Sequence, residues 1–168
     1  MRIRQSRATP SSPSQASERD TASGVSQENV NKTMDFIAAY NRRDFDAAVE
    51  FFHPEVDWVL PALQRSDSCR GPDEVKRFWE GLDETFDELT LKPQETIDAG
   101  DRVAVRLRHH GRGTGSGLEI DTELYHQVTT FRDGTMVRIE YFESWPEALG
   151  AAGLRQSALA FDLRRQAP

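Results

Sequence analysis

The apolar positions in the first half of the chain recur with the 3.6-residue period of an α-helix. A first helix is predicted from about Gln27. Asp44 and Pro72 mark the starts of two more, because aspartate caps helices well and proline suits a first turn. The predicted apolar faces are Val30, Met34, Ile37 and Ala38 with Phe36 and Tyr40 beside them, then Phe45, Ala48, Val49 and Phe52, then Val75, Phe78, Trp79, Leu82 and Phe86.

Apolar and polar residues alternate in other segments, which is the period of a β-strand. A short strand at Val56, Trp58 and Leu60 is predicted between the second and third helices. The later strands follow one another with short turns, which favours an antiparallel sheet. These later elements are strands over 89–98, 103–110, 120–132 and 135–142, with a flexible Gly-rich loop at 111–117 and a short helix over 145–152.

This order of elements predicts an α+β fold in which three N-terminal helices pack on a curved antiparallel sheet. A curved sheet closed by helices forms a cone that can enclose a cavity. The domain is expected to span residues 28–153, with a weak extension over 154–168. Residues 1–27 form a polar tail that is expected to be disordered, although its Arg-rich, acid-poor opening also has features of a transit peptide.

The amino-acid composition excludes several classes of binding partner. The 168 residues suit one domain, and a formal net charge of −7 argues against binding nucleic acid through phosphate contacts. No apolar run is long enough for a membrane span, so no membrane partner is expected. One cysteine and four dispersed histidines offer neither a disulfide nor a metal-ligand spacing. No metal or cofactor is therefore expected, and a cytoplasmic location is predicted.

The strongest local signal is the dipeptide Asp133-Gly134, because a two-residue type I′ hairpin turn needs positive φ at both central positions. Such a turn also fixes which residues of the two strands share a face. With a regular ladder, Gln127 lies opposite Glu140, and His126 lies on the other face; a bulge would reverse this assignment. The expected pocket face carries Tyr125, Gln127, Thr129, Phe131, Arg138, Glu140 and Phe142.

Two residues on the expected pocket face are candidates for acid/base catalysis. Glu140 in an apolar pocket would have a raised pKa and could exchange protons near neutrality. The alternative is that it forms an ion pair with Arg138 on the sheet. His109 continues an apolar alternation along its strand and is expected to face inward, unless it lies at the mouth of the cavity or in a dimer interface.

Aromatic residues are expected to form the cavity wall, which would suit a flat, apolar or polycyclic ligand. The alternative for most of them is an ordinary place in the core. Tyr125 could supply a hydroxyl donor, or its hydroxyl could be satisfied by the backbone. The aromatic candidates are Phe36, Tyr40, Trp58, Phe78, Trp79 and Phe142.

Three segments resemble the SnoaL-like branch of the NTF2-like superfamily: AAYNRRDFDAAVEFFHPEVDW, RGPDEVKRFWEGL and TTFRDGTMVRIEYFESWPEALGAAGL. The resemblance covers roughly residues 28–153, and the last segment is its most specific part. It implies a cone-shaped α+β barrel, a homodimer, and a pocket between the concave face of the sheet and the helices. It does not imply one reaction, because the superfamily includes polyketide cyclases, ketosteroid isomerases, epoxide hydrolases and dehydratases.

The catalytic residues of two of these enzyme classes do not carry over. The positions of the ketosteroid isomerase base, phenol and protonated carboxyl correspond to Leu60, Phe36 and Gln127 here. Epoxide hydrolases of the limonene type pair an acid on the last strand with an Arg-x-Asp on an earlier one, and residues 106–110 contain no carboxylate. SnoaL-type cyclases need one acid/base group, which Glu140 or a histidine could supply.

The resemblance and the residues together predict a small-molecule pocket protein. If catalytic, it would perform acid/base chemistry on an apolar carbonyl or epoxide compound through Glu140, helped by His109 or Gln127. The rival hypothesis is a non-catalytic ligand-binding or dimerisation module. An open cavity with Glu140 facing in favours the first, and a filled cone with Glu140 paired to Arg138 favours the second.

Overall fold

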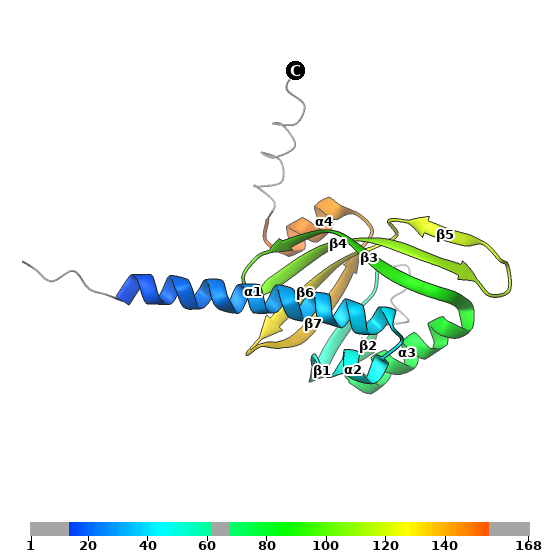
Figure 1. Cartoon of the computed structure of the whole chain (residues 1–168), viewed down its shortest axis with the longest axis horizontal. Coiled ribbons are helices and arrows are strands. Elements are labelled where there is room, and N and C mark those ends of the chain that lie inside the picture. The colour runs from blue at the N-terminus through cyan, green and yellow to red at the C-terminus, as the bar shows by residue number, and fades with distance from the viewer. Residues whose placement is uncertain (1–13, 62–67, 155–168) are drawn as a thin grey trace, which may run out of the picture.

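The computed structural model describes residues 14–61 and 68–154, with side chains from residue 23 onward (Figure 1). The helices are α1 (Ser14–Asn41), α2 (Phe45–Val49), α3 (Pro72–Thr85) and α4 (Trp145–Ala151). The strands are β1 (Phe52–Val59), β2 (Cys69–Arg70), β3 (Phe86–Asp98), β4 (Arg102–Gly113), β5 (Glu119–Thr122), β6 (His126–Arg132) and β7 (Thr135–Phe142). The α+β class predicted from the pattern is confirmed.

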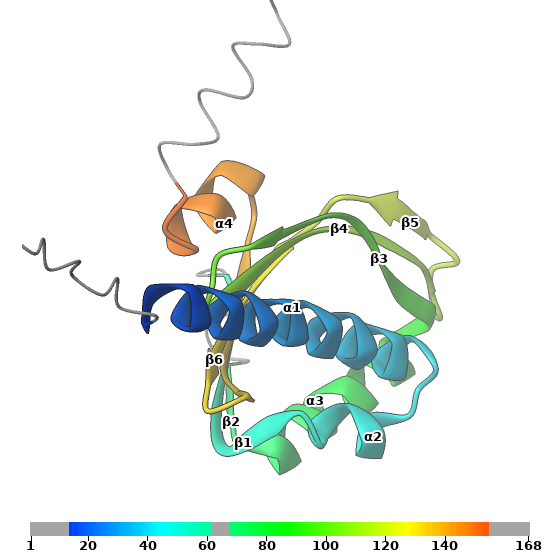
Figure 2. The ribbon, with the colours of Figure 1, turned by 60° about the vertical axis from the view of Figure 1, so that its left-hand side comes forward.

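One mixed, curved sheet organises the molecule, in the order β2-β1-β7-β6-β4-β3 with β5 beside β4. The β3-β4-β6-β7 meander is antiparallel, as predicted, whereas β1 pairs with β7 in parallel. The parallel pair arises because the chain leaves β1, crosses through α3 and builds the meander before returning beside β1. Figure 2 shows α1 lying across the concave side, α2 and α3 closing its lower end, and α4 on the opposite side of the sheet.

Helix α1 begins at Ser14, well before the predicted start near Gln27, so part of the segment expected to be disordered is helical. Residues 1–13 of that segment lie outside the described residues. Extending a helix from a packed end costs far less than starting one, which accounts for the longer helix. Among the helices within residues 14–61 and 68–154, none is long and apolar enough to cross a membrane.

The buried face of α1 differs from the predicted apolar stripe. Asn29 and Thr33 are buried, whereas Ala38 is exposed. Burial is possible because both polar side chains are satisfied: Asn29 Nδ2 donates to the Gly100 carbonyl (3.1 Å), and Thr33 Oγ1 donates to the Asn29 carbonyl (2.9 Å). The correct stripe therefore includes two polar positions that hydrophobicity alone does not select.

Shorter elements follow their sequence signals closely. Asp44 caps α2 by accepting a hydrogen bond from the Ala47 amide (3.2 Å), as predicted. Strand β1 begins two residues before Pro54, earlier than predicted, and buries Val56 and Trp58. The expected strand over 120–132 is divided into β5 and β6, and part of the expected Gly-rich loop extends β4 to Gly113.

A β-bulge in the last hairpin overturns the predicted pairing. Asp133 and Gly134 both have positive φ (52° and 73°), and Phe131 pairs with Met136, as the two-residue turn requires. The register then shifts, so that Gln127 pairs with Tyr141 instead of Glu140. The shift turns Ile139 inward beside the already buried Met136, so both side chains are fully buried.

Gly111 on β4 lies against the backbone of β3, where a Cβ atom would come within 3.1 Å of the Leu89 Cα. We expect Gly111→Ala to lower the free energy of unfolding by about 1–3 kcal/mol, because the two strands must move apart. Chemical denaturation measures the effect. Gly115→Ala is the matched control, since a Cβ there meets nothing within 4 Å. Equal stability of the two variants would contradict the tight strand contact.

Candidate functional site

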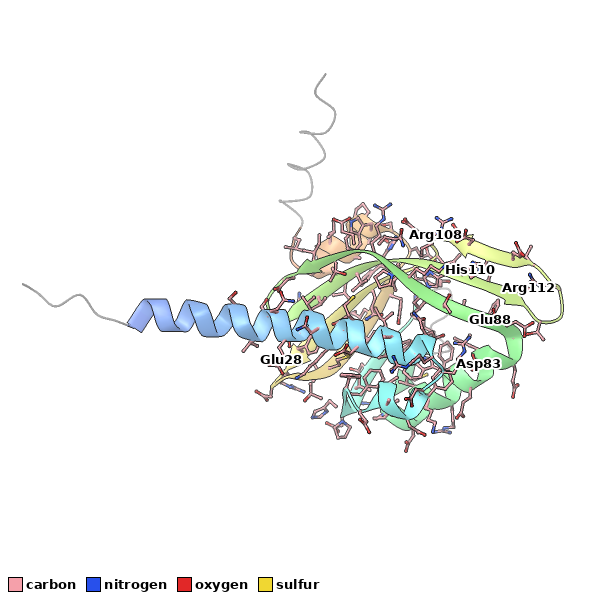
Figure 3. All side chains as sticks on the ribbon, in the orientation of Figure 1. Glu28, Asp83, Glu88, Arg108, His110 and Arg112 are labelled. Carbon is pink, nitrogen blue, oxygen red and sulfur yellow. The ribbon has the colours of Figure 1, made fainter. Side chains whose placement is uncertain are left out.

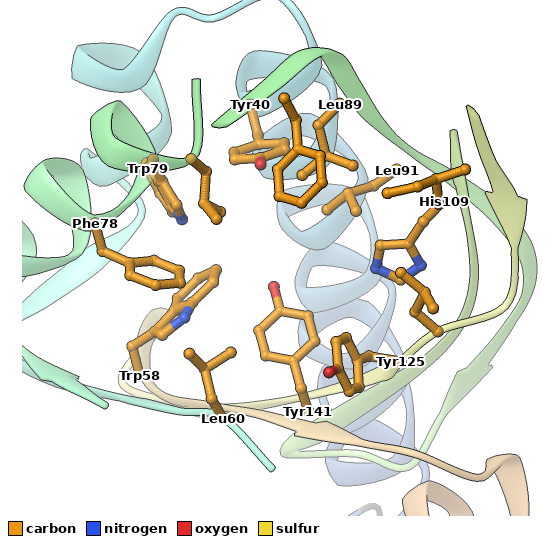
Figure 4. A pocket seen from close by; sticks show the side chains of 14 residues that line it. Tyr40, Trp58, Leu60, Phe78, Trp79, Leu89, Leu91, His109, Tyr125 and Tyr141 are labelled. Atoms are coloured by element: carbon orange, nitrogen blue, oxygen red, sulfur yellow. The ribbon is translucent and has the colours of Figure 1, made fainter. Parts of the chain in front are cut away.

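A partly open cavity of about 190 Å³ lies between the concave face of the sheet and helices α1 and α3 (Figure 4). Its wall is almost entirely aromatic and aliphatic, and none of its described lining residues is acidic, Lys or Arg. It is therefore suited to a small, mostly apolar molecule. The lining residues are Tyr40, Trp58, Leu60, Phe78, Trp79, Leu82, Phe86, Leu89, Leu91, His109, Ile120, Leu124, Tyr125 and Tyr141.

Several residues predicted for the pocket face lie elsewhere. Phe36 packs beneath the cavity against Trp79, with ring centroids 6.0 Å apart. Gln127 and Thr129 face inward and are buried, but they are absent from the wall. The predicted pocket residues that do line the cavity are Tyr40, Trp58, Phe78, Trp79, His109 and Tyr125.

Glu140, Arg138 and Phe142 lie on the outer face of the sheet, because the bulge reverses their side of β7. The Arg138 guanidinium contacts Glu140 (Nη2 to Oε1, 3.0 Å) and Asp57 (Nη1 to Oδ2, 3.5 Å). The hydrogen bond to Glu140, offset in part by desolvation, raises the pKa of Arg138. The expectation that Glu140 faces the pocket is therefore wrong, and the carboxylate is held in the ion pair that the sequence offered as the alternative.

His109 lies on β4 and faces the cavity, with 6% of its surface exposed. Its ring meets the Tyr125 ring edge-on, with centroids 6.0 Å apart. Burial, and secondarily the nearby His126, lower its pKa to about 4. Its Nδ1 is buried and has no hydrogen-bond partner within residues 14–61 and 68–154. The imidazole is thus neutral at physiological pH.

The residues flanking His109 on β4 face the opposite way, as the alternation predicts. Arg108 pairs with Asp121 (2.7 Å) and Arg112 with Glu119 (3.0 Å) across the β4-β5 hairpin. His110 is exposed, and Figure 3 shows these three side chains at the outer surface. The inward position of His109 is therefore part of a regular strand and does not depend on a bulge in β4.

Tyr141 is the site residue that the predicted register missed. Its hydroxyl donates to Gln127 Oε1 (3.2 Å), and Gln127 Nε2 donates to Thr129 Oγ1 (2.8 Å). Burial raises the pKa of Tyr141 well above its usual value, so the phenol stays protonated. The apolar spacing of Met136 and Ile139 is the sequence signal that could have revealed the bulge and hence Tyr141.

Tyr40 brings a second phenol to the wall, one helical turn after Phe36 on α1. The Arg43 guanidinium lies over its ring, 5.6 Å from the centroid, and contacts Asp83 (Nε to Oδ1, 3.1 Å). Burial raises the pKa of Tyr40 to about 12, against the opposing effect of Arg43. The cavity therefore has protonated phenols on two sides of its wall.

His126 lies on the outer face, away from the cavity, as predicted, and Glu140 shares this face because of the bulge. Its Nδ1 accepts from the Leu107 amide (3.4 Å), and its ring packs against Trp145 of α4, with centroids 5.6 Å apart. Burial lowers its pKa. No three His, Cys, Asp or Glu side chains within the described ranges are grouped so that they could hold a metal ion.

Solved structures share this architecture at low identity. An NTF2-like protein from Burkholderia pseudomallei is 23% identical with a TM-score of 0.63, covering 73% of this chain and 95% of that one. TerC, crystallised with polyporic acid, is also 23% identical, with a TM-score of 0.62 and coverages of 75% and 98%. A proposed polyketide cyclase from Sinorhizobium meliloti is 24% identical, with a TM-score of 0.53 and coverages of 68% and 93%.

The sequence itself establishes the family. No curated protein sequence matches the chain significantly. The family model of the SnoaL-like domain matches residues 34–139, which is more than half of the chain. The match includes α2, α3, the first five strands of the chain, β6 and His109. The chain therefore belongs to the SnoaL-like family, with the NTF2-like fold that its sequence segments predicted.

Proposed function

We propose that the cavity binds a small, mostly apolar carbonyl compound and that His109 exchanges a proton with it. The observation that carries the proposal is the buried imidazole of His109, which lines an aromatic cavity and whose Nδ1 has no hydrogen-bond partner among the described residues. A neutral imidazole can accept a proton from an acidic position of a bound ligand and return it at another position. The reaction would then be isomerase-like or cyclase-like.

The apolar wall of the cavity controls how strongly His109 binds a proton. The pKa of about 4 makes His109 a weak base in the empty cavity. A ligand whose negative charge develops beside the ring would stabilise the imidazolium and strengthen the base. The protonated phenol of Tyr40 lines the same cavity and can donate to the ligand's oxygen, whereas the Tyr141 hydroxyl already donates to Gln127.

Two structures with this fold support the proposal of an organic ligand: one was crystallised with polyporic acid, and another is a proposed polyketide cyclase. Their low identity limits this support to the fold. The rival hypothesis of a non-catalytic module has one feature in its favour, the Glu140–Arg138 pair. The open cavity favours a ligand pocket over a filled cone.

A ligand screen followed by turnover assays tests the proposal. Small apolar ketones are screened by thermal shift, and the hits are assayed with wild type, His109→Asn and Glu140→Gln. We expect His109→Asn to keep binding but to lose at least about 100-fold in turnover, because general acid/base groups contribute that much. Glu140→Gln is the matched control and should stay close to wild type. Full turnover by His109→Asn would remove the imidazole from the mechanism, and a screen without hits would contradict the pocket.

A further inference from the structure

Two indole N–H groups in the cavity wall have no hydrogen-bond partner among the described residues. Trp58 is 4% exposed and Trp79 is 1% exposed, and the Nε1 atom of each is fully buried and unpaired. Both residues line the cavity. A buried donor without an acceptor is costly, so native structures rarely leave one without a reason.

The unpaired groups are concentrated at this one place. Elsewhere in the described part of the chain, the buried Asn29, Thr33 and Gln127 side chains all form hydrogen bonds. The other two buried atoms without a hydrogen bond, Arg43 Nη1 and Asp83 Oδ1, belong to an ion pair in which Arg43 Nε lies 3.1 Å from that oxygen. The remaining three are the two indole nitrogens and His109 Nδ1, and all three residues line the cavity.

The two indoles occupy adjoining parts of the wall. Trp79 comes from α3 and Trp58 from β1, and their rings meet edge to face with centroids 5.3 Å apart. Figure 4 shows the nitrogen edge of Trp79 turned toward the cavity, with Trp58 and Phe78 on the same side and His109 on the opposite side. A ligand that spans the cavity would meet donors at one end and the imidazole at the other.

We infer that the indole N–H groups of Trp58 and Trp79 determine ligand specificity by binding an acceptor oxygen at the end of the ligand remote from His109. An indole N–H only donates, so it selects carbonyl, ether or phenolate oxygens and rejects groups that only donate. The inference rests on the proposed ligand pocket and specifies the ligand's polarity: an oxygen at one end and a proton-exchanging position at the other. The competing arrangement is donation from these N–H groups to neighbouring aromatic faces.

A pair of ligands of matched shape separates these arrangements. 2-Acetylnaphthalene carries a terminal carbonyl, and 2-ethylnaphthalene replaces it with methylene. The hydrocarbon is the more hydrophobic, so apolar burial alone cannot favour the ketone. We expect wild type to bind the ketone about ten-fold more tightly, as one or two added hydrogen bonds imply. Equal affinities, or tighter binding of the hydrocarbon, would overturn the inference.

Substitutions assign the preference to the indoles. Trp58→Phe and Trp79→Phe remove the N–H while keeping an aromatic ring, and each should reduce the preference for the ketone several-fold. Phe78→Leu is the matched control, because it removes aromatic surface from the same wall without removing a donor. It should weaken both ligands and leave their ratio unchanged. A ketone preference that survives in both tryptophan variants would assign the preference to other groups and overturn the inference.

Indole NMR signals of the wild type keep the test independent of how well the variants fold. The chain has three tryptophans, and Trp145 lies outside the cavity against His126. The ketone, compared with the hydrocarbon, should move the Trp58 and Trp79 indole proton signals downfield and leave Trp145 unchanged. Identical shifts with both ligands would mean that the N–H groups face neighbouring rings. If neither ligand binds, both the proposed ligand pocket and this inference are contradicted. If both ligands bind equally, only the inference about the indole groups is contradicted.

Discussion

Replacing Trp79 with alanine is expected to lower the free energy of unfolding by about 3–5 kcal/mol, the range for large aromatic side chains removed from a core. Trp79 is 1% exposed and is central to the aromatic cluster beneath the cavity. Its ring lies within 6.0 Å, centroid to centroid, of five others. These neighbours are Phe36, Tyr40, Phe45, Phe52 and Trp58.

Denaturant unfolding followed by circular dichroism measures this loss. Trp145→Ala is the matched control, because Trp145 is only partly buried and lies on the other side of the sheet. It should cost markedly less. If Trp79→Ala cost no more than Trp145→Ala, the cluster around Trp79 would not be the main support of the cavity floor.

The second large expected effect is that the free energy of unfolding decreases by about 3 kcal/mol when the pH falls from 6.5 to 4. The pKa of His109 is lowered from 6.5 in a solvated chain to about 4 in the folded protein, chiefly by burial. Between these values the unfolded chain binds a proton that the folded chain does not, so acid favours unfolding. Each unit of pKa shift corresponds to about 1.4 kcal/mol. The stabilisation is complete above pH 6.5 and is lost as the pH falls toward 4.

Unfolding curves at several pH values test this dependence. His109→Leu should remove most of the slope, whatever its effect on stability at neutral pH. His126, whose pKa is also lowered by burial, adds to the slope in the same direction. His110→Asn is the control, since His110 is exposed on the neighbouring position of β4. An unchanged slope in His109→Leu would show that the imidazole is not buried as described.

The features that could be predicted from the sequence are those set by residues close together in the chain. The Asp44 cap, the Asp133-Gly134 turn and the alternation that turns His109 inward all depend on a few neighbouring residues. The class of the fold followed from the order of such elements. The inward face of β4 was correct because that strand keeps its alternation from Val103 to His109.

The sequence could not predict features set by contacts distant in the chain. The bulge in β7 depends on packing in the core around Met136 and Ile139, and one inserted residue reverses every side chain beyond it. A regular ladder therefore puts Glu140 on the pocket face, whereas the bulge puts Tyr141 there. The burial of Asn29 depends on the Gly100 carbonyl, 71 residues away in the sequence. The Asn29 contact leaves no signal in the local hydrophobic pattern, and the bulge leaves only the three-residue spacing of the apolar Met136 and Ile139.

The most direct test of the pocket is an NMR titration of ¹⁵N-histidine-labelled protein with 2-acetylnaphthalene. The chain has four histidines, and only His109 lines the cavity in the described part of the structure. Ligand binding should shift the His109 ring nitrogens and leave those of His53 and His110 unchanged. Saturable binding without a change at His109, or no binding, would contradict a ligand pocket built around this imidazole.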